Sequence, residues 1–327
     1  LFYHILFIFA SIILNNLKII ALFGNFKRFC GNNLVGEIHV KNYSDLINEL
    51  SIEFSAFKDV KTGETTEHKF GYELDFYSVK TAKEASKLGK GRGNYAVLSF
   101  PQFLDNNKSA LQYYYRQFKA VLSEFLGDVK QSDVILVVGL GNRHISADSL
   151  GVEVVKRLIV TREMASKLPS VCVFSPSVMG LTGIETADTV EAIVDKVRPT
   201  MIVYIDSLCA SHSARLGRSF QISSTAITPG AGVYNTRRKP KTLVCKTISI
   251  GVPFVVYAGT FLKSELEDEN ISINDIKDNK LKTAINRILS TRNDQLVTLK
   301  DIEESVAKAG KFVAHAINEI IFGVKEL

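Results

Sequence analysis

The chain has 327 residues, of which 46% are hydrophobic and 23% are charged, and its formal net charge is +6. A chain of this length and composition can bury a substantial core, which excludes wholesale disorder and favours one large domain or two modest ones. The basic excess is spread along the chain, and a short basic cluster at 237–241 is more typical of a solvated loop than of a nucleic-acid site.

The four cysteines are widely separated, and no CxxC pair occurs among them. They are Cys30, Cys172, Cys209 and Cys245. No histidine stands at metal-ligand spacing from them, and a disulfide framework is not expected in a chain this long. We therefore expect reduced cysteines and a cytoplasmic protein.

The N-terminal region differs from the rest of the chain. Residues 1–14 are almost entirely apolar, but this run is short for a membrane span and no basic residue precedes it. Three interpretations are open: a spurious or poorly ordered extension, a packed helix, or a membrane anchor. We expect residues 1–42 to form an N-terminal extension and residues 43–327 to form a single α/β domain that does not associate with a membrane.

From residue 43 onward, apolar runs and helical periodicities alternate along the chain. In chain order, we predict a helix at 80–90, a strand at 95–100, a helix at 107–127, a strand at 133–138, a helix at 149–162, a strand at 171–174, a helix at 189–197, a strand at 201–205, a strand at 248–257 broken at Gly251 and Pro253, and a helix at 299–321. This alternation indicates an α/β fold with a mainly parallel or mixed twisted sheet flanked by helices.

Two aspartates stand at similar places after buried strands. Asp206 directly follows the strand at 201–205, and Asp148 follows the strand at 133–138 after a short loop. Ligands of open parallel sheets bind outside the carboxyl ends of the strands, so the two carboxylates converge there if the strands are near neighbours. Adjacent carboxylates share a proton, which supplies a base to activate water and an acid for the leaving amine. The alternative is that each aspartate caps a following helix.

The loop that begins at Gly139 and Gly141 does not complete a dinucleotide-binding fingerprint. The GxGxxG pattern requires a third glycine at 144, where this chain has His144. The Walker loop, the GxSxG nucleophile elbow and the HExxH motif do not occur either. These findings disfavour nucleotide enzymes, serine hydrolases and common zinc proteases, and we expect neither a cofactor nor a metal.

Several further features have both a functional and a structural interpretation. His144 and His212 each stand near an aspartate and are either metal ligands or proton shuttles, or solvated loop residues. The segment 180–186 is predicted to form a tight turn before a helix, with Thr182 or Thr186 as the cap. The polar stretch 221–232 either lines a peptide groove or connects two elements.

Six ordered segments of the chain resemble the germination protease family of spore-forming bacteria. They are AKEASKLGKGRGNYAVLSFP (82–101), VVGLGNRHISADSLGVEVVKRLIVTRE (137–163), VMGLTGIETADTVEAIVDKVRP (178–199), VYIDSLCASHSARLGRSFQISSTAITPGAGVYNTRRK (203–239), ISIGVPFVVYA (248–258) and LVTLKDIEESVAKAGKFVAHAINEII (296–321). The resemblance covers residues 80–321, and this many segments in the family's order and spacing are not expected by chance.

The resemblance implies an aspartic-type endopeptidase with Asp148 and Asp206 as its catalytic pair. It implies that the substrates are small acid-soluble spore proteins, which are degraded in the spore core during germination. It also implies synthesis as a zymogen, assembly into a homotetramer, no cofactor, no direct nucleic-acid contact, and a fold similar to that of hydrogenase maturation proteases. Two alternatives stay open: a metal-dependent maturation-type protease, and an inactive member that binds peptides.

The chain departs from the family pattern at several positions. Arg143 stands where the family has Trp, Ala147 where it has Pro, Glu163 where it has His, and Tyr257 where an Asp is usual. The first two changes bear on the shape of the loop that presents Asp148. The segment at 43–46, Tyr-Ser-Asp-Leu, is similar to the Arg-Thr-Asp-Leu-Ala segment near which family zymogens are trimmed.

Overall fold

The computed structural model describes residues 44–53, 69–164, 167–226, 245–291 and 295–324. In this part of the chain, one sheet has the strand order β1-β2-β6-β7-β5-β3-β4, and β8 pairs with β7 off this path. The strands are β1 (Glu73–Val79), β2 (Gly93–Ser99), β3 (Val134–Gly139), β4 (Ser170–Phe174), β5 (Met201–Ala210), β6 (Ser219–Ser223), β7 (Lys246–Tyr257) and β8 (Leu296–Thr298). Strands β4, β3, β5 and β7 are parallel, whereas the pairs β7–β6, β6–β2, β2–β1 and β7–β8 are antiparallel.

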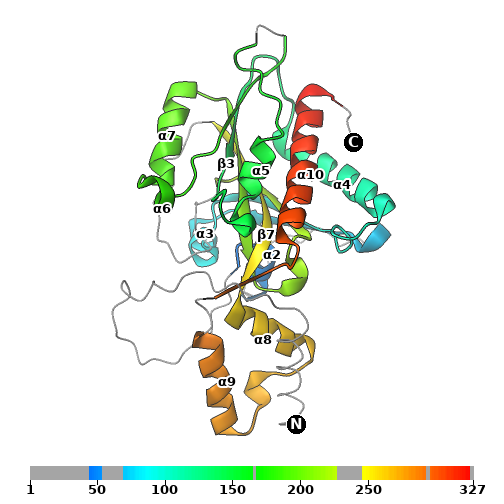
Figure 1. Cartoon of the computed structure of the whole chain (residues 1–327), viewed down its shortest axis with the longest axis vertical. Coiled ribbons are helices and arrows are strands. Elements are labelled where there is room, and N and C mark those ends of the chain that lie inside the picture. The colour runs from blue at the N-terminus through cyan, green and yellow to red at the C-terminus, as the bar shows by residue number, and fades with distance from the viewer. Residues whose placement is uncertain (1–43, 54–68, 165–166, 227–244, 292–294, 325–327) are drawn as a thin grey trace.

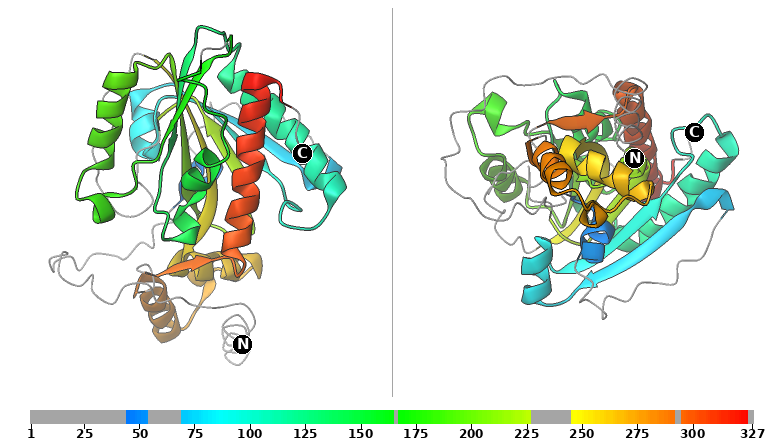
Figure 2. Two further views of the ribbon diagram at one scale, coloured as in Figure 1. Left: turned by 45° about the horizontal axis from the view of Figure 1, so that its top comes forward. Right: turned by 90° about the horizontal axis from the view of Figure 1, so that it is seen from below.

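Helices cover both faces of this sheet (Figure 1). The described α-helices are α2 (Ile47–Glu53), α3 (Ala82–Leu88), α4 (Lys108–Leu126), α5 (Leu150–Val155), α6 (Met179–Thr182), α7 (Thr186–Val197), α8 (Ala258–Asp268), α9 (Asn279–Thr291) and α10 (Ile302–Phe322). One face packs against α4, α5 and α10, and the other packs against α7 on the parallel half and α2 and α3 on the antiparallel half. Helices α8 and α9 lie together beyond one end of the sheet in Figure 1 and in the left view of Figure 2.

The central strands are apolar on both faces because helices cover them on both sides. In β3, Ile135 and Val137 belong to the core beneath α4, α5 and α10, whereas Leu136 and Val138 pack toward α7. Successive side chains of a strand point to opposite faces, so a continuous apolar run is needed to fill both cores. The predicted α/β fold with a mixed twisted sheet is therefore confirmed.

Helix α5 is shorter than the predicted helix at 149–162. It ends at Val155, and from Ile159 onward main-chain N–H groups bond to other elements. Ile159 N–H donates to Asn318 Oδ1 of α10 at 3.0 Å, and Thr161 N–H donates to the Val171 carbonyl of β4 at 3.0 Å. These tertiary bonds replace the helical i→i−4 bonds and lead the chain into β4.

Strands β5 and β7 are longer and more regular than predicted. β5 continues past 205 to Ala210 because β7 pairs with it over its full length. β7 is one strand, although we expected breaks at Gly251 and Pro253. It accommodates Pro253 with a register shift between Leu208 and Cys209 of β5, which is the kind of irregularity where a strand tolerates proline.

Some predictions fall outside the described residues. These are the N-terminal extension at 1–42, the basic cluster at 237–241, and the second half (227–232) of the polar stretch at 221–232. The described start of that stretch is not a loop, because residues 221–223 belong to β6. Among the described helices, none is long and apolar enough to cross a membrane.

Candidate active site

Asp206 lies inside β5, between Gly251 of β7 and the point where β3 leaves the sheet. The residue is only 8% exposed. Burial raises the pKa of Asp206 well above its ordinary value, and the negative charges of Asp148 and Asp45 raise the pKa further, while a hydrogen bond from Ser207 N–H lowers it. Asp206 is therefore suited to hold a proton when ordinary aspartates are ionised.

Asp148 ends the short 3-10 helix η2 (Ser146–Asp148), directly before α5. Asn142 N–H donates both to the Asp148 carbonyl at 2.9 Å and to Asp148 Oδ2 at 3.0 Å. This contact requires a glycine at 141, because Gly141 has φ +105° and a Cβ there would lie 1.9 Å from the Asp148 carbonyl oxygen. Asp148 is half-buried and accepts a main-chain N–H, an arrangement that suits an ionised carboxylate.

Adjacent parallel strands bring the two aspartates together. β3 pairs with β5 up to Gly139 and Ile205, and Leu140 N–H donates to the Ile205 carbonyl at 2.8 Å. The first turn of α5 then returns to β5, where Leu150 N–H donates to Ser207 Oγ at 3.4 Å. The fold thus brings Asp148 close enough to Asp206 for its charge to raise the pKa of Asp206. The capping alternative fails for Asp206 because it lies within a strand.

A third aspartate, Asp45, also lies near Asp206, although it was not predicted as a site residue. We call Asp45, Asp148 and Asp206 the acidic group. Asp45 precedes α2, and it forms two hydrogen bonds with Cys209 of β5: Asp45 N–H donates to the Cys209 carbonyl at 2.8 Å, and Cys209 N–H donates to Asp45 Oδ2 at 2.9 Å. The Asp45 carbonyl accepts Lys90 Nζ at 2.6 Å and Gln221 Nε2 at 3.2 Å. The only signal in the sequence was the likeness of residues 43–46 to a family segment, which we had associated with zymogen trimming.

The two histidines occupy structural positions. His144 is exposed, and its main-chain N–H donates to Asn142 Oδ1 at 2.9 Å. His212 Nδ1 accepts Ala214 N–H at 3.2 Å at the start of the 3-10 helix η3 (Ser213–Arg215), and its Nε2 lies 3.0 Å from Asp268 of α8. Neither contact involves the catalytic candidates, so the structural interpretation of both histidines is favoured.

The predicted cap residues act differently from what we expected. The segment before α7 includes the short helix α6, and Glu185 is the N-cap residue of α7. Thr182 Oγ1 accepts Ile184 N–H at 3.2 Å within the turn, and Thr186 Oγ1 donates to the Ser177 carbonyl at 3.3 Å. Both threonines therefore stabilise the connection from β4 to α7 without capping α7.

The departures from the family pattern have different surroundings. Arg143 and Glu163 are exposed, whereas Ala147 is half-buried and packs against the core under α5 and α10. Tyr257 is buried at the end of β7, where it precedes α8. The loop that presents Asp148 thus keeps its contact with Asn142 despite Arg143 and Ala147.

Metal-ligating side chains do not gather in the described residues. No group of three or more His, Cys, Asp or Glu side chains there is arranged to hold a metal ion. The described cysteines, Cys172, Cys209 and Cys245, are free thiols. Burial raises the pKa of each of these thiols, so they are poor thiolate ligands at neutral pH.

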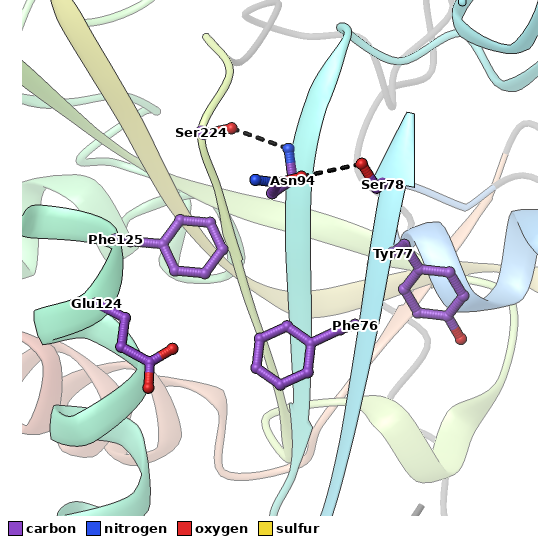
Figure 3. A pocket seen from close by; sticks show the side chains of 7 residues that line it. All are labelled: Phe76, Tyr77, Ser78, Asn94, Glu124, Phe125 and Ser224. Carbon is purple, nitrogen blue, oxygen red and sulfur yellow. Dashed lines mark hydrogen bonds between the residues drawn. The ribbon is translucent and has the colours of Figure 1, made fainter. Parts of the chain in front are cut away.

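The antiparallel half of the sheet carries a separate pocket of about 390 Å³ (Figure 3). Phe76 of β1 and Phe125 of α4 form its apolar walls. Between them, Asn94 of β2 accepts Ser78 Oγ at 3.0 Å on its Oδ1 and donates its N–H to Ser224 Oγ at 2.9 Å. Neither Asp148 nor Asp206 lines this pocket, so it is distinct from the acidic group.

Known proteins similar to this chain were found by sequence and by structure. The profile of the germination protease family matches residues 43–268. A germination protease from Clostridium perfringens is 30% identical over 300 residues, which cover 79% of this chain and 92% of the relative. Those from Clostridium tetani and Bacillus subtilis are each 34% identical, over 71% and 58% of this chain and 79% and 55% of the relatives. The crystal structure of a NiFe hydrogenase maturation protease, HycI, from Thermococcus kodakarensis aligns with a TM-score of 0.33 and 15% identity over 60% of this chain and 98% of that chain.

Proposed function

Because this chain belongs to the germination protease family, it is a peptidase, and we propose that it is an aspartic-type endopeptidase in which Asp148 and Asp206 activate water. The observation that carries the proposal is that a buried carboxyl, Asp206, whose pKa is raised by burial and by the charge of Asp148, lies beside the carboxyl end of β3 with the half-buried Asp148. In aspartic-type sites, different environments give two carboxyl groups different pKa values, so that one serves as the acid and the other as the base.

The chemistry of such a pair is hydrolysis by general acid–base catalysis. The ionised carboxylate takes a proton from water while the water oxygen bonds to the peptide carbonyl carbon, and the protonated partner gives its proton to the carbonyl oxygen. The resulting gem-diol collapses when the first carboxyl passes its proton to the amide nitrogen and the C–N bond breaks. One hydroxyl of the gem-diol returns its proton to the second carboxylate, so the pair regains its starting state.

The substrates that we propose are small acid-soluble spore proteins, and the place of action is the spore core. This part of the proposal rests on membership of the family and on its relatives in Clostridium and Bacillus. Residues 43–327 would form the peptidase domain, with residues 1–42 as a removable segment and a homotetramer as the assembly. These points extend the proposal, and the acidic pair does not depend on them.

The test is digestion of a purified small acid-soluble spore protein by wild type and by Asp206→Asn, with fragments identified by mass spectrometry. Wild type should give discrete fragments with or without a chelator, and Asp206→Asn should lower the rate at least about 100-fold, the usual scale of one general acid–base group. Asp128→Asn is the matched control, because it removes the same charge at an exposed position after α4.

Other results would point elsewhere. Loss of activity in chelator and its return with a divalent metal would favour a metal-dependent protease. Tight binding of the substrate without cleavage, also after removal of residues 1–42, would indicate an inactive peptide-binding member. Normal turnover by Asp206→Asn would exclude the proposed pair.

A further inference from the structure

β3 stops pairing with β5 at Gly139 and Ile205, so the edge of β5 that faced β3 has no partner strand beside Asp206. The Ile205 carbonyl faces β3, since it accepts Leu140 N–H at 2.8 Å. Main-chain groups of alternate residues along a strand face the same edge, so Ser207 and Cys209 also present their N–H groups on this side. The pairing irregularity with β7 leaves β5 itself regular, because the additional residue, Phe254, belongs to β7.

Asp45 is bound to this edge three residues along β5 from Asp206. Cys209 N–H donates to Asp45 Oδ2 at 2.9 Å, and main-chain positions three residues apart along a strand are about 10 Å apart. At this range the charge of Asp45 raises the pKa of Asp206. Asp45 and Asp206 are therefore neighbours beside one strand, although they are far apart in the sequence.

Contacts from three directions fix the place of Asp45. Its main-chain N–H donates to the Cys209 carbonyl, while its carbonyl accepts Lys90 Nζ from the loop after α3 and Gln221 Nε2 from β6. The next residue, Leu46, is fully buried against Leu208, which lies on the same face of β5 as Asp206. The carboxylate of Asp45 is thus presented by a rigid frame.

We infer that Asp45 is a positioning residue of this peptidase: its fixed carboxylate keeps the shared proton on Asp206, so that Asp206 is the acid and Asp148 is the base. The inference rests on the proposed function and assigns the roles that the symmetric pair leaves open. Asp148 suits the basic role because it is half-buried and its Oδ2 accepts Asn142 N–H at 3.0 Å.

The other charged groups around Asp206 do not reverse this assignment. Asp148 from η2 and Asp45 from the segment before α2 both raise the pKa of Asp206, after burial as the largest cause. Glu49 of α2 accepts Ser211 N–H at 2.7 Å and adds negative charge near Cys209. Lys90 is the cation of this group; its ammonium is bound to the Asp45 carbonyl, and burial lowers the pKa of Lys90.

The first test is the pH dependence of kcat/KM for wild type, Asp45→Asn and Asp128→Asn with a small acid-soluble spore protein. Asparagine can still accept Cys209 N–H but carries no charge. If the charge of Asp45 holds the proton on Asp206, the alkaline limb of the Asp45→Asn profile moves about one pH unit lower, and kcat/KM above that limb falls about tenfold with little change in KM. Asp128→Asn should leave the limb in place.

The second test is independent of activity: the Tm of wild type, Asp45→Asn, Asp206→Asn and the double variant as a function of pH. An aspartate whose pKa is raised in the folded state stabilises that state fully only at pH values below its unfolded-state pKa of about 3.9. This stabilisation is lost as the pH rises through the pKa of the folded state. Above the alkaline limb of the wild-type profile, where Asp206 is ionised, Asp206→Asn should therefore raise the Tm. Because Asp45→Asn also removes the favourable interaction with buried Lys90 in both backgrounds, its effect on the Tm should be about 2–4 °C more favourable in the wild-type background than in the Asp206→Asn background.

The outcomes separate the two proposals. An unmoved alkaline limb together with no coupling between positions 45 and 206 in Tm would overturn the role of Asp45, even if Asp206→Asn is inactive. Full activity of Asp206→Asn would instead remove the proposed function, whatever the result at Asp45. Equal Tm gains of Asp45→Asn in both backgrounds would show that the charge acts on another group.

Discussion

At the scale of single residues, the site depends on main-chain groups as much as on carboxylates. Asn142 and Cys209 each donate a main-chain N–H to one carboxylate of the acidic group. Such bonds place a carboxylate more firmly than a contact with a flexible side chain does, because the donor is part of a strand or a tight loop. The residue that makes the loop possible is Gly141, whose missing Cβ leaves room for Asp148.

Gly141→Ala should therefore lower both stability and activity. The new methyl group would overlap the Asp148 carbonyl, and φ +105° is unfavourable for alanine. We expect a loss of at least about 1–3 kcal/mol in the free energy of unfolding, measured in guanidinium chloride, and a large fall in kcat.

The matched control is Gly183→Ala, at φ +70° with no atom within 4 Å of the added Cβ. Gly183→Ala also places alanine at a positive φ, which costs about 1–2 kcal/mol, but its new methyl group overlaps no other atom. If both variants lost the same stability and kept the same kcat, the contact between Gly141 and Asp148 would not matter for the site.

At the scale of elements, helix α5 fixes the position of Asp148 because it begins two residues later. Its first turn packs directly on the main chain at the end of β3. A Cβ on Gly151 would lie 2.4 Å from Leu140 N, and one on Gly139 would lie 2.3 Å from the Gly151 carbonyl. The close approach of α5 to the sheet is thus possible only with glycine at both positions.

Gly151→Ala should push α5 away from β3 and disturb Asp148. We expect a loss of about 1–3 kcal/mol in the free energy of unfolding, the scale of overpacking, together with reduced kcat/KM. Gly180→Ala in α6 provides the comparison, since nothing lies within 4 Å of its added Cβ. Alanine should raise helix stability there by about 0.5–1 kcal/mol. Equal effects of the two variants would contradict the packing argument.

At the scale of the whole molecule, an aromatic cluster joins the C-terminal helix to the antiparallel half of the sheet. The ring of Phe312 in α10 lies 5.0 Å from Phe103, 5.2 Å from Phe118 of α4 and 5.4 Å from Phe220 of β6, between ring centroids. These residues belong to the core opposite the face that carries Asp206. The Phe312 cluster therefore lies on the face of the sheet opposite to Asp206.

Phe312→Ala should consequently destabilise the protein without changing its chemistry. Removing a buried Phe ring costs about 3–5 kcal/mol, and thermal or denaturant unfolding would measure the loss. At temperatures where the variant stays folded, kcat should match wild type. Lys311→Ala, at the neighbouring exposed position, should change stability by no more than about 0.5 kcal/mol. A specific fall in kcat of folded Phe312→Ala would refute the separation of the two faces.

Local patterns in the sequence determined the alternation of strands and helices from β2 to β7, the doubly buried strand β3, and the association of two aspartates with buried strands. They suffice because side-chain periodicity records which faces a strand or helix buries. β1, β6 and β8 escaped prediction, as did helices α2, α6, α8 and α9. β1 is half-exposed at the sheet edge, and β6 continues into polar sequence, so neither shows a clear apolar run.

Only the tertiary structure decided where α5 and β5 end and which residues form the site. Asp45, Lys90 and Gln221 come from separate parts of the chain, and their meeting depends on hydrogen bonds across β5 and β6. No local pattern encodes such a meeting, because strand order and the packing of α2 on the sheet are set by long-range contacts. The sequence thus determined that two carboxylates belong to or follow neighbouring buried strands, and the fold decided that Asp206 lies inside β5 with a third carboxylate beside it.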